Sequence, residues 1–119
     1  MTSVFPPSDG LEVSPEQTQQ ALADGTAIVV DVREQDERDA GYIEGSRHIP
    51  LQSLSSEAAT LPKDTTIVFQ CRVGGRSGMA AQALRASGYA DAWSMAGGLL
   101  QWDAEGRPLA PDGGVVADH

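Results

Sequence analysis

A lone cysteine in a short glycine- and arginine-rich run is the part of this sequence best suited to chemistry. The run spans residues 71–77 and reads CRVGGRS. Residues 66–70 before it are apolar and β-branched and predict a buried strand, and residues 77–88 after it predict a helix. Glycine N–H groups, the positive end of that helix and two arginines would together stabilise a nucleophilic thiolate at Cys71. The alternative is a buried cysteine that acts as a small hydrophobic residue, and the flanking glycines and arginines disfavour it.

Short apolar strands and helices alternate along the rest of the chain. The Ser14-Pro15-Glu16-Gln17 segment has the pattern of a capping box with proline at the first helical position. The alternation indicates an α/β fold with a parallel sheet covered on both faces, in which ligands bind beyond the C-terminal ends of the strands. Strands are expected at 11–13, 27–31, 46–49, 66–70 and 92–95, and helices at 14–23, 34–40, 51–59, 77–88 and from 98 to about 106.

Length and composition suit one domain with one hydrophobic core. The chain has 119 residues, 40% of them hydrophobic, and a formal net charge of -9 with only 8 lysines and arginines. Because nucleic acids and anionic membrane surfaces are bound through clustered cations, neither is an expected partner. A single cysteine suits a reducing compartment, and no signal-like or membrane-spanning segment is evident, so the expected location is the cytoplasm.

The domain is expected to cover residues 1–110. Residues 1–10 are expected to form a loose N-terminal segment, and residues 111–119, which are small, polar and acidic, a disordered tail. No cluster of cysteine and histidine residues has the spacing of metal ligands, so no metal site is expected.

Four segments form a specific pattern when taken in this order and spacing. They are 30–34 (VDVRE), 41–50 (GYIEGSRHIP), 71–77 (CRVGGRS) and 95–99 (MAGGL), with Trp102 behind the last. The pattern resembles the rhodanese (thiosulfate sulfurtransferase) family in its single-domain form. The resemblance implies a three-layer α/β sandwich with a five-stranded parallel sheet, strand order 1-5-4-2-3, and helices on both faces.

The same resemblance implies a sulfur transfer in two steps and no cofactor. The Cys71 thiolate would take the outer sulfur of thiosulfate, or of a related small anionic donor, and become a persulfide. A thiophilic acceptor, which is cyanide, a thiol or a protein, would then remove that sulfur. The implied substrate-binding residues are Arg72, Val73, Gly74, Gly75 and Arg76, and the implied structural supports are Asp31, Arg33 and Ser77.

Three positions depart from the usual pattern of the family. Tyr42 stands where histidine is frequent and Ser46 where alanine is frequent, and both are expected to serve packing or the surface. Val73 stands where strong users of thiosulfate often carry a second cation. Its presence predicts a modest affinity for thiosulfate and leaves the physiological donor open.

The length of the loop separates two possible chemistries. Four residues lie between Cys71 and Arg76, whereas the phosphatases that share this fold have five, which make a wider cradle for phosphate. The shorter loop favours sulfur transfer over a thiol-dependent phosphatase. Two further alternatives are a non-enzymatic rhodanese-type interaction module, which the presence of Cys71 disfavours, and a protein-to-protein sulfur relay.

The charged residues near the loop have distinct expected roles. Arg72 is expected to point towards the mouth of the site and to bind the substrate anion. Arg76 is a cation at a helix N-terminus, where a cation is unfavourable, so an anionic partner is expected, either the substrate or a structural carboxylate. The structural pairing is favoured, and Asp31 is the candidate. Asp31 and Arg33 are expected to brace the site, and the acidic run 34–37 is expected to be a solvated helix face.

Overall fold

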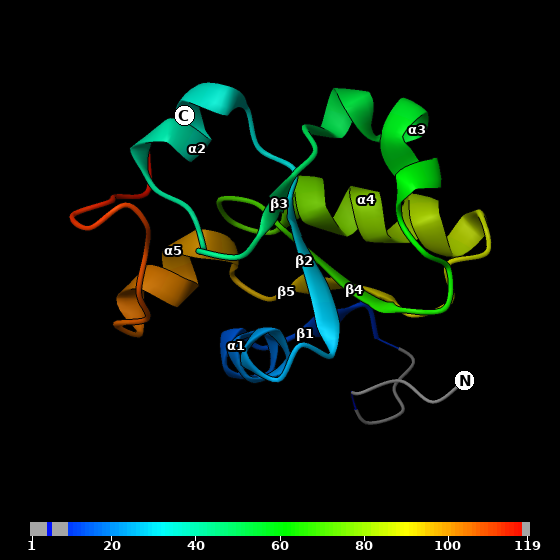
Figure 1. The fold of residues 1–119 in the computed structure, drawn as a ribbon, viewed down its shortest axis with the longest axis horizontal. Helices are drawn as coiled ribbons and strands as arrows, with labels where there is room; N and C mark the ends of the chain where they lie inside the picture. The colour runs from blue at the N-terminus through cyan, green and yellow to red at the C-terminus, as the bar shows by residue number, and fades with distance from the viewer. Residues whose placement is uncertain (1–4, 6–9, 118–119) are drawn as a thin grey trace.

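The computed structural model describes residue 5 and residues 10–117, and strands and helices alternate within it as predicted (Figure 1). The segment 51–59, expected as one helix, is a one-turn α-helix between two 3-10 turns, η1 (Leu51–Ser53) and η2 (Ala58–Thr60). The strands are β1 (Glu12–Val13), β2 (Ala27–Asp31), β3 (Arg47–His48), β4 (Thr66–Gln70) and β5 (Ala92–Met95). The helices are α1 (Pro15–Ala23), α2 (Gln35–Ala40), α3 (Leu54–Glu57), α4 (Gly75–Ala86) and α5 (Gly98–Ala104).

The five strands form one parallel sheet with the order β1-β5-β4-β2-β3, which confirms the order that the resemblance implied. In the centre of the sheet, β2 and β4 are paired along their whole length, with Asp31 opposite Gln70. Cys71 follows Gln70 directly. Asp31 and Cys71 therefore both lie at the C-terminal end of the parallel strands, which is where open α/β sheets bind ligands.

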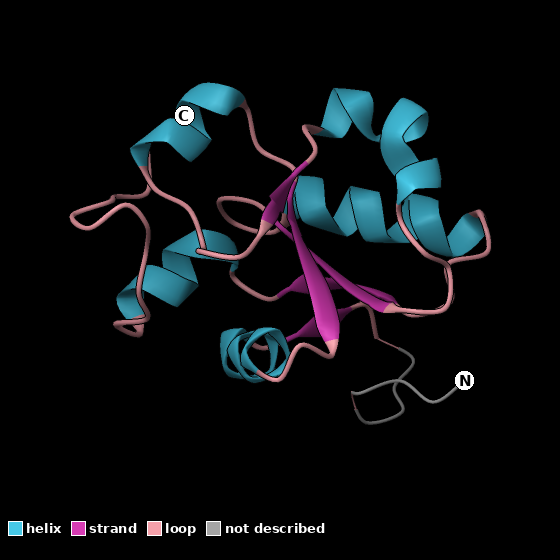
Figure 2. Ribbon diagram, in the orientation of Figure 1, coloured by secondary structure: helices cyan, strands magenta, loops and turns pink. Residues whose placement is uncertain are grey.

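Helices cover the two faces of the sheet and divide the core into two parts (Figure 2). Side chains of β4 alternate between these parts, as the pleat of a strand requires. Ile67 and Phe69 pack with residues of α3 and α4, whereas Val68 packs with residues of α1 and α5. The notable helix contributions are Leu54, Ala80, Ala81 and Leu84 on the first face and Ala21, Leu99 and Trp102 on the second.

Local sequence signals set the starts of two helices. The capping box of α1 is confirmed, because Ser14 Oγ accepts from the N–H of Gln17 (3.0 Å) and the Gln17 side chain accepts from the N–H of Ser14 (2.8 Å). Helix α4 begins at Gly75, two residues before the expected start. Gly74 is its N-cap and has φ +115°, a conformation that glycine adopts without a steric penalty. Ser77 therefore lies in the first helical turn, where backbone N–H groups have no partner within the helix.

The two ends of the domain differ from what the sequence suggests. Phe5, within the segment expected to be loose, is buried and packs edge-to-face on Trp93 with ring centroids 5.6 Å apart. The rest of that segment up to residue 9 lies outside the described residues, as do residues 118–119.

The segment 111–117, expected to be part of a disordered tail, lies against the domain in this structure. The N–H of Val115 donates to the carbonyl of Ala40 (2.9 Å). Immediately before this segment, Ala110 forms an antiparallel bridge with Tyr42. The backbone approach is close at Gly41, where an added Cβ would collide with the backbone of Val115. Glycine at position 41 thus lets the returning chain pack where a larger residue would exclude it.

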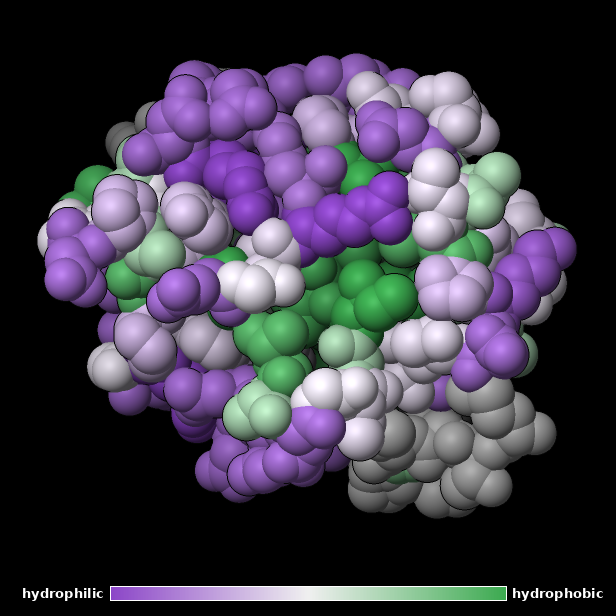
Figure 3. All heavy atoms as spheres, in the orientation of Figure 1, coloured by the Kyte–Doolittle hydropathy of each residue, from purple (hydrophilic) through white to green (hydrophobic). Residues whose placement is uncertain are grey.

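The sheet has one edge that is only partly covered. β3 pairs only with Val30 and Asp31, so the first part of β2 forms the edge of the sheet. Figure 3 shows one face of the molecule, with an apolar area in its middle that is bordered by hydrophilic residues and by residues of intermediate hydropathy. Among the described residues, no helix has the length and apolar character needed to cross a membrane.

Candidate active site

The sulfur of Cys71 lies in a cradle of hydrogen-bond donors made by the loop and the first turn of α4. The N–H of Gly74 is 3.1 Å from Sγ and the N–H of Ser77 is 3.4 Å from it, while Ser77 Oγ is 3.5 Å away. The left-handed conformation of Gly74 turns the chain so that these groups converge on one atom. Cys71 and Ser77 are both fully buried. The structure thus brings the expected nucleophile and its expected support Ser77 together.

Two opposing effects set the pKa of the Cys71 thiol. Burial is the largest single effect and raises the pKa, because a thiolate is poorly solvated there. Hydrogen bonds from the Ser77 side chain, and from the backbone N–H groups of Ser77, Gly74 and Val73, act in the opposite direction. Together they outweigh burial, so the pKa of Cys71 lies below its ordinary value. The lowered pKa of Cys71 therefore comes mainly from hydrogen-bond donors. The sequence had also suggested a contribution from the charges of the two arginines.

The rate of alkylation of Cys71 by iodoacetamide should therefore rise with pH to a plateau, with a midpoint below the ordinary thiol pKa of about 8.5. Only the thiolate reacts, so the midpoint of the profile reports the pKa, and the plateau reports how often the buried sulfur becomes accessible. The chain has no other cysteine, so intact mass measures this one site. A midpoint at or above the value for a free cysteine peptide would contradict an activated thiolate.

The start of α5 holds the loop from the other side. The N–H of Leu99 donates to the carbonyl of Cys71 (2.8 Å), and the N–H of Leu100 donates to the carbonyl of Arg72 (3.0 Å). A Cβ added to Gly98 would lie 2.5 Å from the Arg72 carbonyl oxygen, so glycine is required for this approach. The glycine pair at 97–98 thus attaches α5 to the backbone of the loop.

Asp31 and Arg33, the expected braces, form a fully buried ion pair. Arg33 Nε donates to Asp31 Oδ1 (2.9 Å) and Nη2 to Oδ2 (2.8 Å), and Nη2 also donates to the carbonyl of Gly41 (2.8 Å). Arg38 adds a further contact, with Nη1 3.3 Å from Asp31 Oδ2, and it also binds the carbonyl of Ser46 (2.8 Å). These bonds tie the end of β2 to the segment that follows α2.

The expected pairing of Arg76 with Asp31 is wrong. Arg76 instead forms a bidentate salt bridge with Glu37 on α2, in which Nη1 donates to Oε1 (2.7 Å) and Nη2 donates to Oε2 (2.8 Å). Asp31 is occupied by Arg33 and Arg38, which are closer in sequence. Glu37 is fully buried, so the expectation that all of 34–37 is a solvated helix face is wrong at this position. The hydrogen bond to Glu37 is the main reason that the pKa of Arg76 is raised, and the charges of Cys71 and Asp31 add to it.

Replacing Arg76 with alanine should lower both stability and activity. The buried Glu37 carboxylate would lose its arginine, while Arg76 itself is 31% exposed, so the loss in free energy of unfolding should be about 2 kcal/mol, below that of a fully buried pair. Urea denaturation of the variant measures the loss. Wild-type unfolding behaviour would contradict a bracing role for this pair.

The remaining loop residues lie at the surface of the cradle. Arg72 is half-buried, and its Nε donates to the carbonyl of Ala117 (3.2 Å), so the returning C-terminal segment contacts the loop. Val73 is 56% exposed, and Gly75 is also exposed. Of the loop positions expected to bind substrate, Val73 and Gly74 thus donate backbone hydrogen bonds to Cys71, whereas the side chains of Arg72 and Arg76 bind Ala117 and Glu37.

Three residues of this region escaped the sequence analysis. Glu37 and Arg38 lie on α2, and Ser94 on β5 is 2.7 Å, Oγ to Oγ, from Ser77. One signal could have found Glu37, because it lies three residues after Glu34, the spacing of a capping box, and its carboxylate accepts from the N–H of Glu34 (2.9 Å). Nothing local marks Ser94, since it meets Ser77 only through the pairing of β4 with β5.

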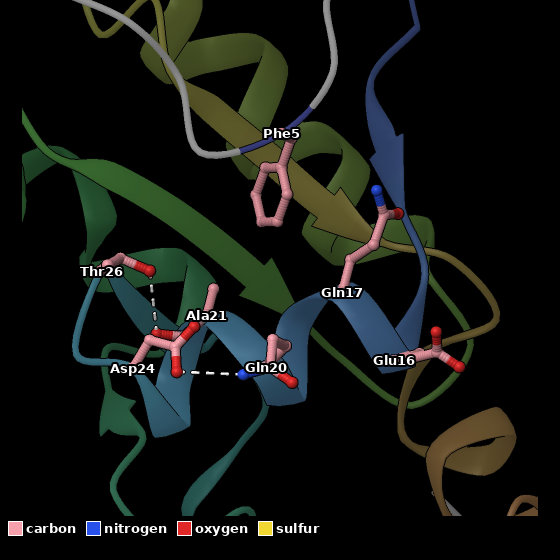
Figure 4. A pocket seen from close by; sticks show the side chains of 7 residues that line it. All are labelled: Phe5, Glu16, Gln17, Gln20, Ala21, Asp24 and Thr26. Atoms are coloured by element: carbon pink, nitrogen blue, oxygen red, sulfur yellow. Dashed lines mark hydrogen bonds between the residues drawn. The ribbon is translucent and has the colours of Figure 1, made fainter.

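A separate pocket of about 390 Å³ lies beside α1, away from Cys71 (Figure 4). Thr26, on its rim, directly precedes β2, so the pocket lies near the opposite end of this strand from Asp31. Its polar side chains bind locally, as in the hydrogen bond from Gln20 to Asp24 (3.0 Å). Within the described part of the chain, no group of three or more histidine, cysteine, aspartate or glutamate side chains could hold a metal ion.

Known proteins share both the sequence pattern and the fold. A sequence profile of the rhodanese-like domain matches residues 14–105. A protein named sulfurtransferase from Allochromatium vinosum is 33% identical over 104 residues, which are 86% of this chain and 97% of that protein. Thiosulfate sulfurtransferase GlpE from Ectopseudomonas mendocina is 33% identical over 97 residues, which are 82% of this chain and 88% of that protein.

Solved structures agree with these relatives. A rhodanese-related protein from Thermoplasma volcanium superposes with a TM-score of 0.77 at 27% identity, over 83% of this chain and 96% of that one. The human single-domain sulfurtransferase gives a TM-score of 0.74 at 30% identity, over 81% of this chain and 97% of that one. With the profile match covering most of its length, this chain belongs to the rhodanese-like domain family.

Proposed function

We propose that this protein is a sulfurtransferase that carries sulfane sulfur as a persulfide on Cys71. The observation that carries the proposal is the convergence of the Gly74 and Ser77 N–H groups and the Ser77 hydroxyl on a single sulfur atom at the start of α4. Membership of the rhodanese-like family and the sulfurtransferases among its relatives support sulfur transfer in general. The donor, the acceptor and the persulfide are our proposals for this chain.

The proposed reaction has two balanced steps. The Cys71 thiolate attacks the outer sulfur of thiosulfate, the S–S bond of thiosulfate breaks, and sulfite leaves with the electron pair. Cys71 then carries a persulfide anion. An acceptor nucleophile, such as cyanide or the thiolate of a small molecule or protein, attacks the outer sulfur, and Cys71 leaves as a thiolate. Because both steps involve the thiolate, the N–H groups of Gly74 and Ser77 assist each of them.

The reaction also sets conditions on access and on location. Cys71 is fully buried, so a donor reaches the sulfur only when the surrounding groups move apart. The thiol must stay reduced between turnovers, which suits a compartment such as the cytoplasm. The proposed partners are therefore a small anionic sulfur donor and a thiol, cyanide or protein acceptor.

Replacing Arg72 with alanine should weaken the use of thiosulfate mainly through KM. Arg72 Nε donates to the Ala117 carbonyl, and an incoming dianion would compete with that carbonyl for the Arg72 guanidinium. Loss of one charge-assisted contact should raise KM about tenfold and change kcat little. Steady-state kinetics over a range of thiosulfate concentrations measure both constants. Unchanged constants would show that Arg72 serves only the contact with the C-terminal segment.

The test of the proposed function is intact-protein mass spectrometry after incubation with thiosulfate. The protein should gain the mass of one sulfur atom and lose it when cyanide is added, with release of thiocyanate. The same preparation should be assayed with p-nitrophenyl phosphate, because the four-residue loop predicts no phosphatase activity. Phosphate release that depends on Cys71, without sulfur transfer, would overturn the proposal. Neither activity in a folded, reduced protein would favour an interaction module or a relay that accepts sulfur only from a protein.

A further inference from the structure

Ser94 lies directly behind the loop that holds Cys71. It is on β5, where it pairs with Phe69 of β4 two residues before the cysteine, and it is 1% exposed. Its Oγ is 2.7 Å from Ser77 Oγ, and Ser77 Oγ is in turn 3.5 Å from Cys71 Sγ. The three side chains therefore form a buried chain of hydrogen bonds that ends at the sulfur.

The direction of this chain follows from counting protons. A serine hydroxyl has one proton to donate and can accept two hydrogen bonds. Among the described residues, Ser77 Oγ is the hydrogen-bond partner found for the Ser94 hydroxyl, whereas Ser77 Oγ also has the carbonyl of Gly74 (3.2 Å) and the Cys71 sulfur. Because a buried hydroxyl proton without an acceptor is costly, Ser94 must donate to Ser77.

We propose that Ser94 is a positioning residue, whose hydroxyl donates to Ser77 Oγ and so leaves the Ser77 proton for the Cys71 thiolate, with the Gly74 carbonyl as the competing acceptor. The opposite direction would direct the Ser77 proton to Ser94, and the thiolate would lose that donor. A donor that itself accepts a hydrogen bond is also polarised and strengthened. Ser94 therefore acts on the sulfur only through Ser77.

The charged groups around the loop stay in place when Ser94 changes. Arg76 is paired with Glu37 and Arg33 with Asp31, and the Nε of Arg72 binds a backbone carbonyl. None of these contacts involves either serine. A change in the pH profile of Ser94 variants would therefore report the hydroxyl chain, rather than a rearranged ion pair.

The experiment is a double-mutant cycle read by the pH dependence of Cys71 alkylation. Ser94→Ala should raise the midpoint by roughly half a pKa unit, because the Ser77 hydroxyl becomes a weaker donor to the thiolate once it no longer accepts a hydrogen bond from Ser94. Ser77→Ala should also raise the midpoint, and adding Ser94→Ala to it should then change nothing. Thr18→Val is the matched control, because it removes a buried hydroxyl on α1 that donates to the Ser14 carbonyl, and its midpoint should be unchanged.

The inference deepens the proposed function, but the alkylation experiment tests it independently of sulfur transfer. Equal shifts from Ser94→Ala with and without the Ser77 hydroxyl, or no shift in either background, would overturn the inference. If Ser77→Ala does not fold, Ser94→Thr replaces it as the decisive variant, because it keeps a hydroxyl on a strand and should restore the wild-type midpoint. Alkylation needs no sulfur donor, so a protein inactive with thiosulfate would still give a clear result.

Discussion

Replacing Cys71 with serine should reduce sulfur transfer from thiosulfate to cyanide by about a thousandfold or more, because the hydroxyl is neither ionised near neutral pH nor able to carry a persulfide. The hydrogen-bond donors of Gly74 and Ser77 would remain, but they would have no thiolate to stabilise. Thiocyanate formation measures the rate, and intact mass measures whether the protein takes up sulfur. The variant should show neither sulfur uptake nor its release.

The fold of this variant must be checked separately from its activity. Cys71 is fully buried, but serine is similar in size and can accept the same N–H bonds, so urea denaturation should show a cooperative transition. A folded Cys71→Ser protein that still forms thiocyanate at a substantial rate would disprove the persulfide mechanism. Met79→Ala is a suitable control variant and should keep wild-type activity, because Met79 is exposed on α4 and has no hydrogen bond to the Cys71 sulfur.

Replacing Asp31 with alanine should cause the largest loss of stability, about 3–5 kcal/mol in the free energy of unfolding. Both side chains of the Asp31–Arg33 pair are 0% exposed, so the variant would leave the Arg33 charge buried without its carboxylate. Arg38 would lose a contact as well, and with it part of the link between α2 and the end of β2. Urea denaturation at neutral pH, with the slope of the transition compared to wild type, measures the loss.

A matched ion pair at the surface provides the control. Glu105 and Arg107 form a salt bridge of 2.9 Å whose side chains are both partly exposed, and Glu105→Gln should change stability far less than Asp31→Ala. A loss from Asp31→Ala no larger than that of the control would show that the buried pair does not brace the site. Arg33→Met tests the same pair from the other side, since it leaves a carboxylate that Arg38 still contacts.

Short stretches of the sequence predict much of the secondary structure. The apolar runs at 27–31 and 66–70 predict buried strands, and the Ser14–Gln17 capping box predicts the start of α1, because each depends on neighbours a few residues away. The resemblance to rhodaneses added the strand order, which local pattern alone does not specify. Boundaries were less accurate, as the earlier start of α4 shows, because a glycine N-cap has no side-chain signal.

The candidate site divides in the same way. Residues 71–77 already predict a thiol at a helix start, since loop and helix are contiguous, and the structure places Gly74 and Ser77 around the sulfur accordingly. Sequence reasoning also found Asp31 and Arg33, which are two residues apart and pair with each other. The expected partner of Arg76, Asp31, was wrong, because only the packing of α2 against the loop brings Glu37 within reach of Arg76.

The sequence by itself identified Cys71 as the candidate nucleophile and determined the class of fold and the local order of its elements. The tertiary structure alone decided that Arg76 pairs with Glu37, that Ser94 supports Ser77, and that residues 111–117 return to the domain. Each of these contacts joins residues that are far apart in the sequence. Ser77 and Ser94 are separated by 17 positions, and Glu37 and Arg76 by 39. Local propensities carry no information about such pairs, because hydrogen bonds and ion pairs act over a few ångströms and depend on how the strands and helices pack.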